Sequence, residues 1–192
     1  MTRSVKTIRI IGGFFRGRKL IIPTNHLLRP TPNKVRETLF NWITHAFNLK
    51  DADCLDCYAG SGALAIEALS RNANTVTLLE LHKSSVRQIK NNCRTLGISL
   101  RTTKIRVIHT NTLRWLSQNN TSFNMVFIDP PFQSLLVDIT IKLLEKYKKL
   151  TNGSWIYIEN SIYHPVLNCP SNWLLYRQAF TGQVSYSLYY RR

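Results

Sequence analysis

Cys54-Leu-Asp-Cys-Tyr-Ala-Gly-Ser-Gly62 is the stretch that decides the fold. It begins as a short apolar strand that breaks at Asp56, and Gly60 and Gly62 then let the backbone turn tightly and approach a ligand. A helical run follows directly from Ala63. Because strand, glycine turn and helix form the nucleotide-binding unit of open α/β sheets, the stretch predicts such a sheet with a ligand at its first turn.

The rest of the chain repeats this alternation of strand and helix patterns. The repeat predicts a doubly wound, mostly parallel sheet from residue 52 onward, with an antiparallel hairpin at its end. Thr31 is expected to cap the helix that precedes the sheet, and Ser85 with Gln88 is expected to form a capping box. The expected strands end at residues 56, 80, 109, 129 and 159, the expected helices span about 32–47, 62–72, 85–96 and 134–149, and the expected hairpins span 8–22 and 173–190.

Carboxylates close four of the predicted strands: Asp56, Glu80, Asp129 and Glu159. The chain has ten acidic residues in all, so this placement is a concentration of charge rather than a scatter. Ligands of open α/β sheets bind beyond the carboxyl ends of the strands. The pattern therefore predicts a binding site along that edge of the sheet.

The spacing of these residues favours one class of ligand. The full dinucleotide pattern has three glycines that serve a pyrophosphate, whereas here Asp56 lies four residues before Gly60, close to where phosphate would bind. Glu80 follows Gly60 by twenty residues, a distance that suits two ribose hydroxyls. A nucleoside with positive charge fits better than a nucleotide. S-adenosylmethionine is such a ligand, because it carries ribose, ammonium and sulfonium groups and no phosphate.

Asp129-Pro130-Pro131-Phe132 is the candidate catalytic stretch. The two prolines fix the loop and lack backbone N–H groups, so its carbonyl groups are available to a ligand. The Asp129 side chain and the Pro130 carbonyl could accept both N–H groups of an exocyclic base amine, while the base rests on Phe132. Such an arrangement accelerates transfer of a methyl group by orientation and electrostatics.

Positive charge dominates the chain and is concentrated at its beginning. The sequence has 26 Lys and Arg residues against 10 acidic ones, a net charge of +16, and residues 1–50 hold ten of the basic residues against Glu37 alone. Such a field attracts nucleic acid. Phe14 and Phe15 could either stack on a base or pack inward. The residues expected to bind RNA are Arg9, Arg16, Arg18, Lys19, Arg29, Lys34 and Arg36. Lys34 and Arg36 are expected on the exposed side of their helix.

Composition excludes several other classes of protein. No apolar run reaches the roughly 18–20 residues of a membrane span, and no secretory signal is visible. Four scattered cysteines do not form a disulfide framework, so a reducing cytoplasm is expected. Cys54 and Cys57 would point to opposite faces of a strand and lack further ligands, so no metal site is expected.

Several stretches of the chain occur together in one known family. They are Ile8-Arg-Ile-Ile-Gly-Gly13, Arg16-Gly-Arg-Lys-Leu20, Leu28-Arg-Pro-Thr31, Val35-Arg-Glu-Thr-Leu-Phe-Asn-Trp42, Cys54-Leu-Asp-Cys-Tyr-Ala-Gly-Ser-Gly-Ala63, Val126-Phe-Ile-Asp-Pro-Pro-Phe132 and Gly182-Gln-Val184. Together they resemble the bacterial small-subunit ribosomal RNA guanine-N2 methyltransferases, and Asp129-Pro-Pro-Phe132 is similar to the D/N-P-P-Y/F signature of amino-group methyltransferases.

The resemblance implies a class I, Rossmann-like methyltransferase with a seven-stranded, mostly parallel sheet and a small amino-terminal extension of hairpin and helix. It implies methyl transfer from S-adenosylmethionine to the amine of one guanine of 16S RNA, at the position numbered 966. In such folds Glu80 binds ribose, and Asn111 lies by the adenine, where many relatives have Asp. The cofactor-binding residues implied are Asp56, Tyr58, Gly60, Gly62, Glu80, Asn111, Thr112 and Asp129.

Two other functions remain open from the sequence. One is a DNA adenine or cytosine amino-methyltransferase, against which the small size of the chain argues. The other is an RNA-binding module without catalysis, against which the intact carboxylates and glycines argue. The organisation expected is a basic RNA-binding extension at residues 1–50 and a methyltransferase domain at residues 51–192, acting as a monomer on the small ribosomal subunit.

Overall fold

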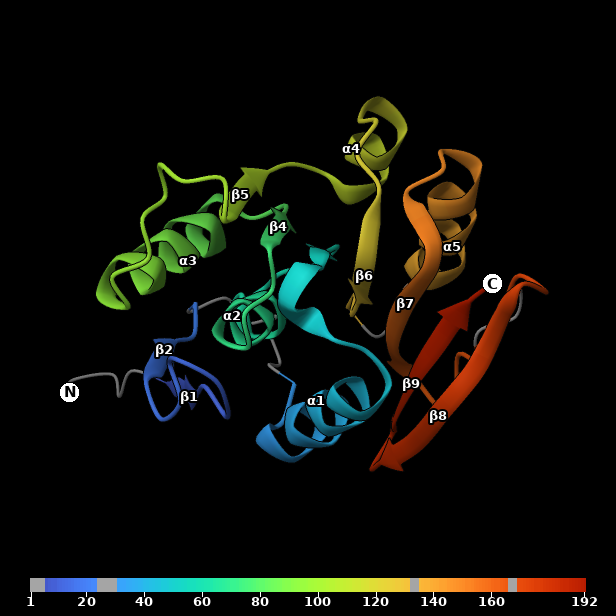
Figure 1. The fold of residues 1–192 in the computed structure, drawn as a ribbon, viewed down its shortest axis with the longest axis horizontal. Coiled ribbons are helices and arrows are strands. Elements are labelled where there is room, and N and C mark those ends of the chain that lie inside the picture. The colour runs from blue at the N-terminus through green and yellow to red at the C-terminus, as the bar shows by residue number, and fades with distance from the viewer. Residues whose placement is uncertain (1–5, 24–30, 132–134, 166–168) are drawn as a thin grey trace.

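A computed structural model describes residues 6–23, 31–131, 135–165 and 169–192. Its centre is one seven-stranded sheet in the order β5-β4-β3-β6-β7-β9-β8 (Figure 1). The first five strands in this order pair in parallel, and β9 is antiparallel to both of its neighbours. The strands are β3 (Asp53–Asp56), β4 (Thr75–Glu80), β5 (Ile105–His109), β6 (Phe123–Ile128), β7 (Leu150–Ser161), β8 (Trp173–Thr181) and β9 (Val184–Arg191).

The strand order reverses next to β3, and this reversal positions the site. The chain proceeds from β3 to β4 and β5 on one side, then returns to place β6 and β7 on the other. In an open parallel sheet the crevice at such a reversal is where ligands bind. The doubly wound sheet and the carboxy-terminal hairpin predicted from the sequence are confirmed.

Helices cover both faces of the sheet, which explains why its inner strands are apolar on both sides. One core contains Cys54, Leu78 and Phe127, together with the side chains of the helices α1, α2 and α3. The other contains Leu55 and Ile128, together with α4 and α5. The helices are α1 (Asn33–Ala46), α2 (Ala63–Ser70), α3 (Lys83–Thr95), α4 (Thr112–Gln118) and α5 (Leu136–Lys146), with a short 3-10 turn, η1, at Leu49–Asp51.

The amino-terminal hairpin forms as predicted and packs against the sheet's own helices. Its strands are β1 (Thr7–Arg9) and β2 (Lys19–Ile21), which pair antiparallel. Ile8 and Leu20 belong to the same core as α2 and α3. At the hairpin tip Gly13 adopts φ of 73°, and a Cβ there would lie 1.8 Å from the Ser70 carbonyl oxygen. The hairpin therefore approaches α2 too closely for any other residue at this position.

The phenylalanines at the hairpin tip divide between the two environments left open by the sequence. Phe14 is 85% exposed, whereas Phe15 is partly buried against the core. Their rings meet edge to face with centroids 5.0 Å apart. The Phe14 and Phe15 backbone N–H groups donate to the carbonyl and hydroxyl oxygens of Ser70, so the tip is fixed while Phe14 faces outward.

Two local predictions at helix starts are wrong. The expected cap Thr31 makes no capping bond, because α1 begins after Pro32 without a side-chain cap. The expected capping box at Ser85 and Gln88 also fails, because α3 begins after His82 and Ser85 lies buried inside the helix. The short helix α4 was not predicted, and Asn111 caps it.

Arg36 corrects a prediction about the surface. The sequence placed it on the exposed side of its helix, but its side chain is fully buried. One guanidinium nitrogen donates to the Arg9 carbonyl at 2.8 Å and to Asn33 Oδ1 at 2.6 Å, and another lies 3.6 Å from Glu67 Oε2. Burial lowers the pKa of Arg36 while Glu67 opposes this change. Arg36 thus joins the hairpin, α1 and α2, and is not available to bind RNA.

Within the described residues, no helix is long and apolar enough to cross a membrane, and no group of three or more His, Cys, Asp or Glu side chains could hold a metal ion. Cys54 and Cys57 are both buried.

The buried arrangement around Arg36 leads to a prediction about stability. Arg36→Met should lower the free energy of unfolding by about 3–5 kcal/mol, because Glu67 then remains buried with less compensating charge. Urea denaturation measures this loss. Lys34→Ala, an exposed change on the same helix, should change stability by at most about 0.5 kcal/mol. Equal small effects of both changes would contradict the structural role of Arg36.

Candidate active site

The four predicted carboxylates come together at the carboxyl edge of the sheet. Asp56 and Glu80 are the last residues of β3 and β4, and Asp129 follows β6. Glu159 is buried two residues before the end of β7, where it accepts a hydrogen bond from the Tyr157 hydroxyl at 2.9 Å. Their charges influence one another, because Glu80 raises the pKa of Asp56 while Glu159 and Asp56 raise that of Asp129.

Glu80 is fixed by the glycine turn. Its Oε2 accepts from the Gly60 backbone N–H at 2.8 Å, and its Oε1 accepts from the His82 N–H at 2.7 Å. Gly60 and Gly62 adopt φ of 53° and 78°, values that favour glycine. A Cβ on Gly62 would meet three buried side chains at 3.3 Å. The turn therefore depends on both glycines, and each oxygen of Glu80 retains a lone pair for a hydroxyl.

Asp56 occupies the same edge and is almost fully buried. Its Oδ1 accepts from the Tyr58 N–H at 3.4 Å. Burial raises the pKa of Asp56 to about 7, with a further contribution from Glu80, while the backbone N–H groups of Tyr58 and Ala65 oppose the rise. A cation bound at this edge would favour the ionised carboxylates, whereas a phosphate would be repelled.

Asp129 accepts a hydrogen bond from a residue that the sequence did not place in the site. The Thr31 hydroxyl donates to Asp129 Oδ2 at 3.0 Å, across 98 residues of sequence. Burial and the neighbouring Glu159 raise the pKa of Asp129 well above its usual value, and the hydrogen bond from Thr31 opposes this rise. Pro130 is buried and Pro131 is exposed, while Phe132 lies outside the described residues. Residue 31, before α1, thereby contributes directly to the site.

Three further residues that were expected to bind the cofactor make hydrogen bonds within the protein. The side-chain Oδ1 of Asn111 accepts from the Arg114 N–H at 3.1 Å, as the cap of α4. The hydroxyl of the buried Thr112 donates to the Cys57 carbonyl, and the Tyr58 hydroxyl is 2.6 Å from Thr140 Oγ1 on α5. These contacts join the loops after β3 and β5 to each other and to α5. The Asn111 oxygen that was expected to face adenine is already engaged by the helix.

A cavity of about 240 Å³ opens beside the two prolines. This volume is smaller than the roughly 300–1,000 Å³ of pockets for drug-sized ligands and suits a single planar base. Its polar lining comes from Asp138 on α5, from the end of β7 and from the segment after β7. Beside the two prolines the lining includes Glu159, Asn160, Tyr163 and His164.

Comparison with known proteins assigns this arrangement to a family. Residues 8–190 match a family model described as conserved hypothetical protein 95. The chain is 46% identical over 184 residues to ribosomal RNA small subunit methyltransferase D of Escherichia coli strain K12, covering 96% of this chain and 90% of that protein. The chain belongs to the small-subunit ribosomal RNA methyltransferase D family.

Two further relatives agree with this membership. The methyltransferase D of Haemophilus influenzae is 43% identical over 184 residues, which cover 95% of this chain and 93% of that protein. The solved structure of a putative methyltransferase, yhhF, from Escherichia coli is 45% identical with a TM-score of 0.84, and the match covers 97% of this chain and 99% of that one. The fold is accordingly that of class I methyltransferases, as the sequence predicted.

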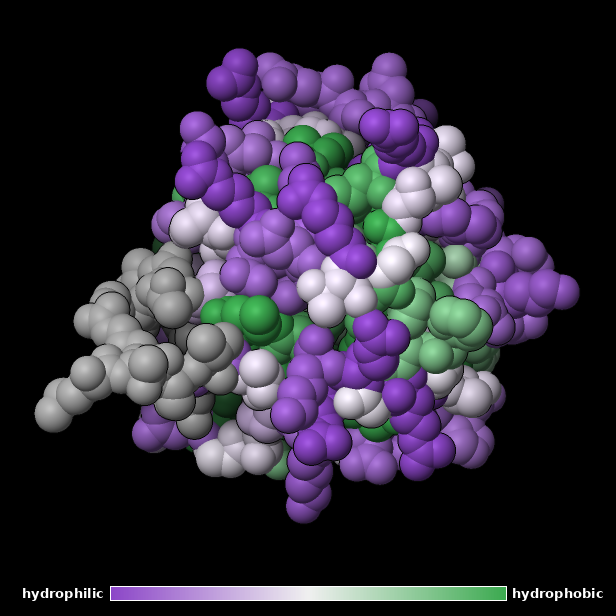
Figure 2. All heavy atoms as spheres, turned by 90° about the vertical axis from the view of Figure 1, so that its left-hand side faces the viewer, coloured by the Kyte–Doolittle hydropathy of each residue, from purple (hydrophilic) through white to green (hydrophobic). Residues whose placement is uncertain are grey.

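The basic residues expected to bind RNA fall into three groups. Arg9, Arg16, Arg18 and Lys19 are exposed on the hairpin, and Lys34 is exposed at the start of α1. Arg36 is buried, as described above, and Arg29 lies outside the described residues. Figure 2 shows hydrophilic side chains spread over the side of the molecule that carries the hairpin.

Two parts of the candidate site were not predicted from the sequence. Thr31 was assigned to a helix cap, and no local signal links it to a carboxylate 98 residues away. The cavity residues Asn160, Tyr163 and His164 carried a usable signal, because they directly follow Glu159 at the carboxyl end of a predicted strand.

The contact between Thr31 and Asp129 gives a prediction that can be tested without any substrate. Thr31→Val should raise the pKa of Asp129 further, because it removes a donor that favours the ionised carboxylate. Carboxyl carbon NMR titration of Asp129 measures the change. Thr31→Ser retains a hydroxyl and should leave the pKa close to that of the original protein. An unchanged pKa in folded Thr31→Val would remove Thr31 from the site.

Proposed function

We propose that this chain transfers a methyl group from S-adenosylmethionine to the exocyclic amine of a guanine in 16S ribosomal RNA, at the position numbered 966. The observation that carries the proposal is the position of Asp129 between the carboxylate edge at β3 and β4 and the cavity at the end of β7. Family membership supports it, since the relatives are named ribosomal RNA small subunit methyltransferases.

The carboxyl edge fits S-adenosylmethionine by its chemistry. Glu80 would hold the ribose hydroxyls, and Asp56 with the glycine turn would hold the cationic amino acid part. When bound, the cofactor supplies an electrophilic methyl group on a sulfonium centre. Burial of Asp56 and its elevated pKa show that negative charge is costly at this edge in the free protein, and a cationic ligand reduces that cost.

Asp129 and Pro130 would orient the nucleophile. A guanine amine is weakly nucleophilic because its lone pair is delocalised into the ring. The Asp129 carboxylate and the Pro130 carbonyl would accept its two N–H groups, while Thr31 keeps one carboxylate oxygen in place. As the nitrogen gains positive charge during attack, the ionised Asp129 stabilises it, and this interaction is stronger in the transition state than in the ground state.

The proposed reaction also suggests roles for the other parts of the chain. We infer that residues 1–50 bind RNA and residues 51–192 carry out methyl transfer, although the two parts share one hydrophobic core. Asp56, Tyr58, Gly60, Gly62, Glu80, Asn111 and Thr112 surround the proposed cofactor, with Tyr58 and Asn111 contributing by parts other than their engaged oxygens. A small ribosomal subunit as substrate places the reaction in the cytoplasm, and we propose that the chain acts there as a monomer.

Asp129→Ala should reduce kcat by roughly 10²–10³, the effect of losing one preorganised electrostatic partner. Asp129→Asn retains an acceptor oxygen and should keep more activity. Transfer of labelled methyl groups to small-subunit particles, free 16S RNA and DNA measures both variants and tests the alternative of a DNA methyltransferase. Turnover of Asp129→Ala close to that of the original protein would contradict the proposed role.

Glu80→Ala should weaken S-adenosylmethionine binding by about 1.5–3 kcal/mol, because hydrogen bonds from two ribose hydroxyls to a charged acceptor are lost. Isothermal titration calorimetry measures the affinity. Glu37→Ala, an exposed carboxylate on α1, is the matched control and should leave affinity unchanged. If a folded Glu80→Ala protein binds as tightly as the original, Glu80 does not contact the cofactor.

A further inference from the structure

The middle of the chain carries a second concentration of positive charge. Residues 81–128 contain eight Lys and Arg residues and no Asp or Glu. Their net charge of +8 is comparable to the +9 of residues 1–50, within a segment that belongs to the methyltransferase domain. Negative charge thus ends at Glu80 and returns only at Asp129, and everything between them is neutral or basic.

Half of these basic residues form one stripe along α3. Lys83, Arg87, Lys90 and Arg94 recur at intervals of four, three and four, so they lie on one face of the helix. The stripe spans about 16 Å at 1.5 Å per residue. Lys83, Arg87 and Arg94 are exposed and Lys90 is partly exposed, whereas the buried face of the helix carries Val86, Ile89 and Cys93.

The α3 stripe is not neutralised by the protein itself. Across the described ranges, the ion pairs found join Arg36 and Arg71 to Glu67 and Arg191 to Glu145. Arg94 of the stripe donates a hydrogen bond to an uncharged acceptor, Asn91 Oδ1, at 2.9 Å. Its positive charges are therefore available to an external anion.

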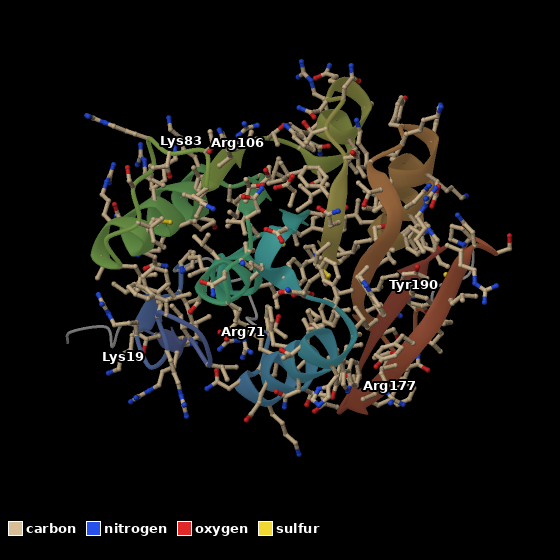
Figure 3. All side chains as sticks on the ribbon, in the orientation of Figure 1. Lys19, Arg71, Lys83, Arg106, Arg177 and Tyr190 are labelled. Atoms are coloured by element: carbon tan, nitrogen blue, oxygen red, sulfur yellow. The ribbon has the colours of Figure 1, made fainter. Side chains whose placement is uncertain are left out.

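The hairpin continues this surface. Arg18 Nη2 donates at 2.7 Å to the carbonyl oxygen of Thr95, which is the last residue of α3. Asn92 on α3 both donates to the Ile21 carbonyl and accepts from the Ile21 N–H, at 2.9 and 3.0 Å. Figure 3 shows Lys83 at one end of α3 and Lys19 on the neighbouring hairpin. The two basic elements are thus held side by side as one rigid surface.

The stripe also begins at the proposed site. Helix α3 starts three residues after Glu80, so Lys83 lies close to the edge at which the cofactor is proposed to bind. From there the stripe leads along α3 to Arg18 of the hairpin. A polyanion that follows it would reach from the hairpin to the edge that contains Glu80.

We propose that the α3 stripe binds the phosphate backbone of the RNA substrate, in continuity with the hairpin. The proposal rests on the proposed function and extends the RNA-binding surface from the amino-terminal extension into the methyltransferase domain. Most contacts of basic side chains to nucleic acid go to phosphate and sugar, and such contacts position the nucleic acid without reading its sequence. The stripe is therefore expected to contribute affinity and orientation rather than to select the guanine.

The test uses two triple variants with the same loss of charge. Lys83→Gln, Arg87→Gln and Arg94→Gln remove three exposed charges from α3. Lys142→Gln, Lys146→Gln and Lys148→Gln remove three exposed charges from α5 and the residues after it, on the opposite face of the sheet. Each triple lowers the net charge from +16 to +13. Gln is a good helix former, and circular dichroism and calorimetric titration with S-adenosylmethionine verify that both proteins remain folded.

Binding of 16S RNA is then measured between low and moderate salt, together with methyl transfer. The α3 triple should reduce the log–log salt slope by about 2–3, because each lost phosphate contact removes roughly 0.7–0.9. Its KM for RNA should rise at least about tenfold, with kcat at saturating RNA and cofactor affinity unchanged. The control triple should reduce the slope by less than about 1.

Three results would overturn these conclusions, and they are distinguishable. Equal effects of the two triples would show that only the general field of the protein matters, which refutes the α3 surface. An unchanged slope for the α3 triple would refute it as well. Failure of the original protein to methylate RNA while binding S-adenosylmethionine would instead refute the proposed function.

Discussion

The buried carboxylate of Glu67 is the contact on which the arrangement of the amino-terminal quarter depends. It accepts from the backbone N–H groups of Ile11 and Gly12, at 2.8 and 2.7 Å, and from Arg71 Nε at 3.0 Å, and it faces the buried Arg36. Removal of a charged group from water is costly unless it is paired and hydrogen-bonded. Satisfying Glu67 therefore requires the hairpin, α1 and α2 to meet at one place, which fixes the hairpin beside α3 and residue 31 beside Asp129.

The carboxyl edge of the sheet places charges where they are unfavourable without a ligand. Asp56 and Asp129 lie close to other carboxylates, and burial raises both of their pKa values. Strained electrostatics of this kind is typical of functional sites, because the same arrangement that destabilises the free protein provides complementarity to a cation. Hydrogen-bond donors partly relieve this cost, among them the Thr31 hydroxyl for Asp129 and the Tyr58 backbone N–H for Asp56.

Acidic and basic side chains are therefore separated in this protein, with the acids of the site at the strand ends and the basic residues at the surface of the hairpin and α3. Asp56, Glu80 and Glu159 are buried at or near strand ends and Asp129 is partly buried after β6. The Lys and Arg residues of the hairpin and α3 are exposed or partly exposed, and no ion pair with an acid is found for them among the described residues. Separation matters because an RNA phosphate drawn to the basic surface would be repelled by the carboxylates. The RNA backbone can thus approach closely while the phosphate-free edge remains for a cationic nucleoside.

The alternation of strands and helices apart from α4, the glycine turn and the acids near the strand ends could all be predicted from the sequence. These features are local: a period of two or 3.6 residues and the backbone freedom of Gly60 and Gly62 can be read without knowing any distant neighbour. The roles of Arg36 and Thr31 depend instead on contacts between distant parts of the chain. A helical pattern assigns a charged residue such as Arg36 to the surface, and only the approach of Glu67 provides a buried partner for it. The Thr31 hydroxyl can cap a helix or contact a distant residue, and the choice between these depends on what long-range packing brings within about 3 Å. Asn111, by contrast, caps α4 through a contact only three residues away, which the sequence could have indicated.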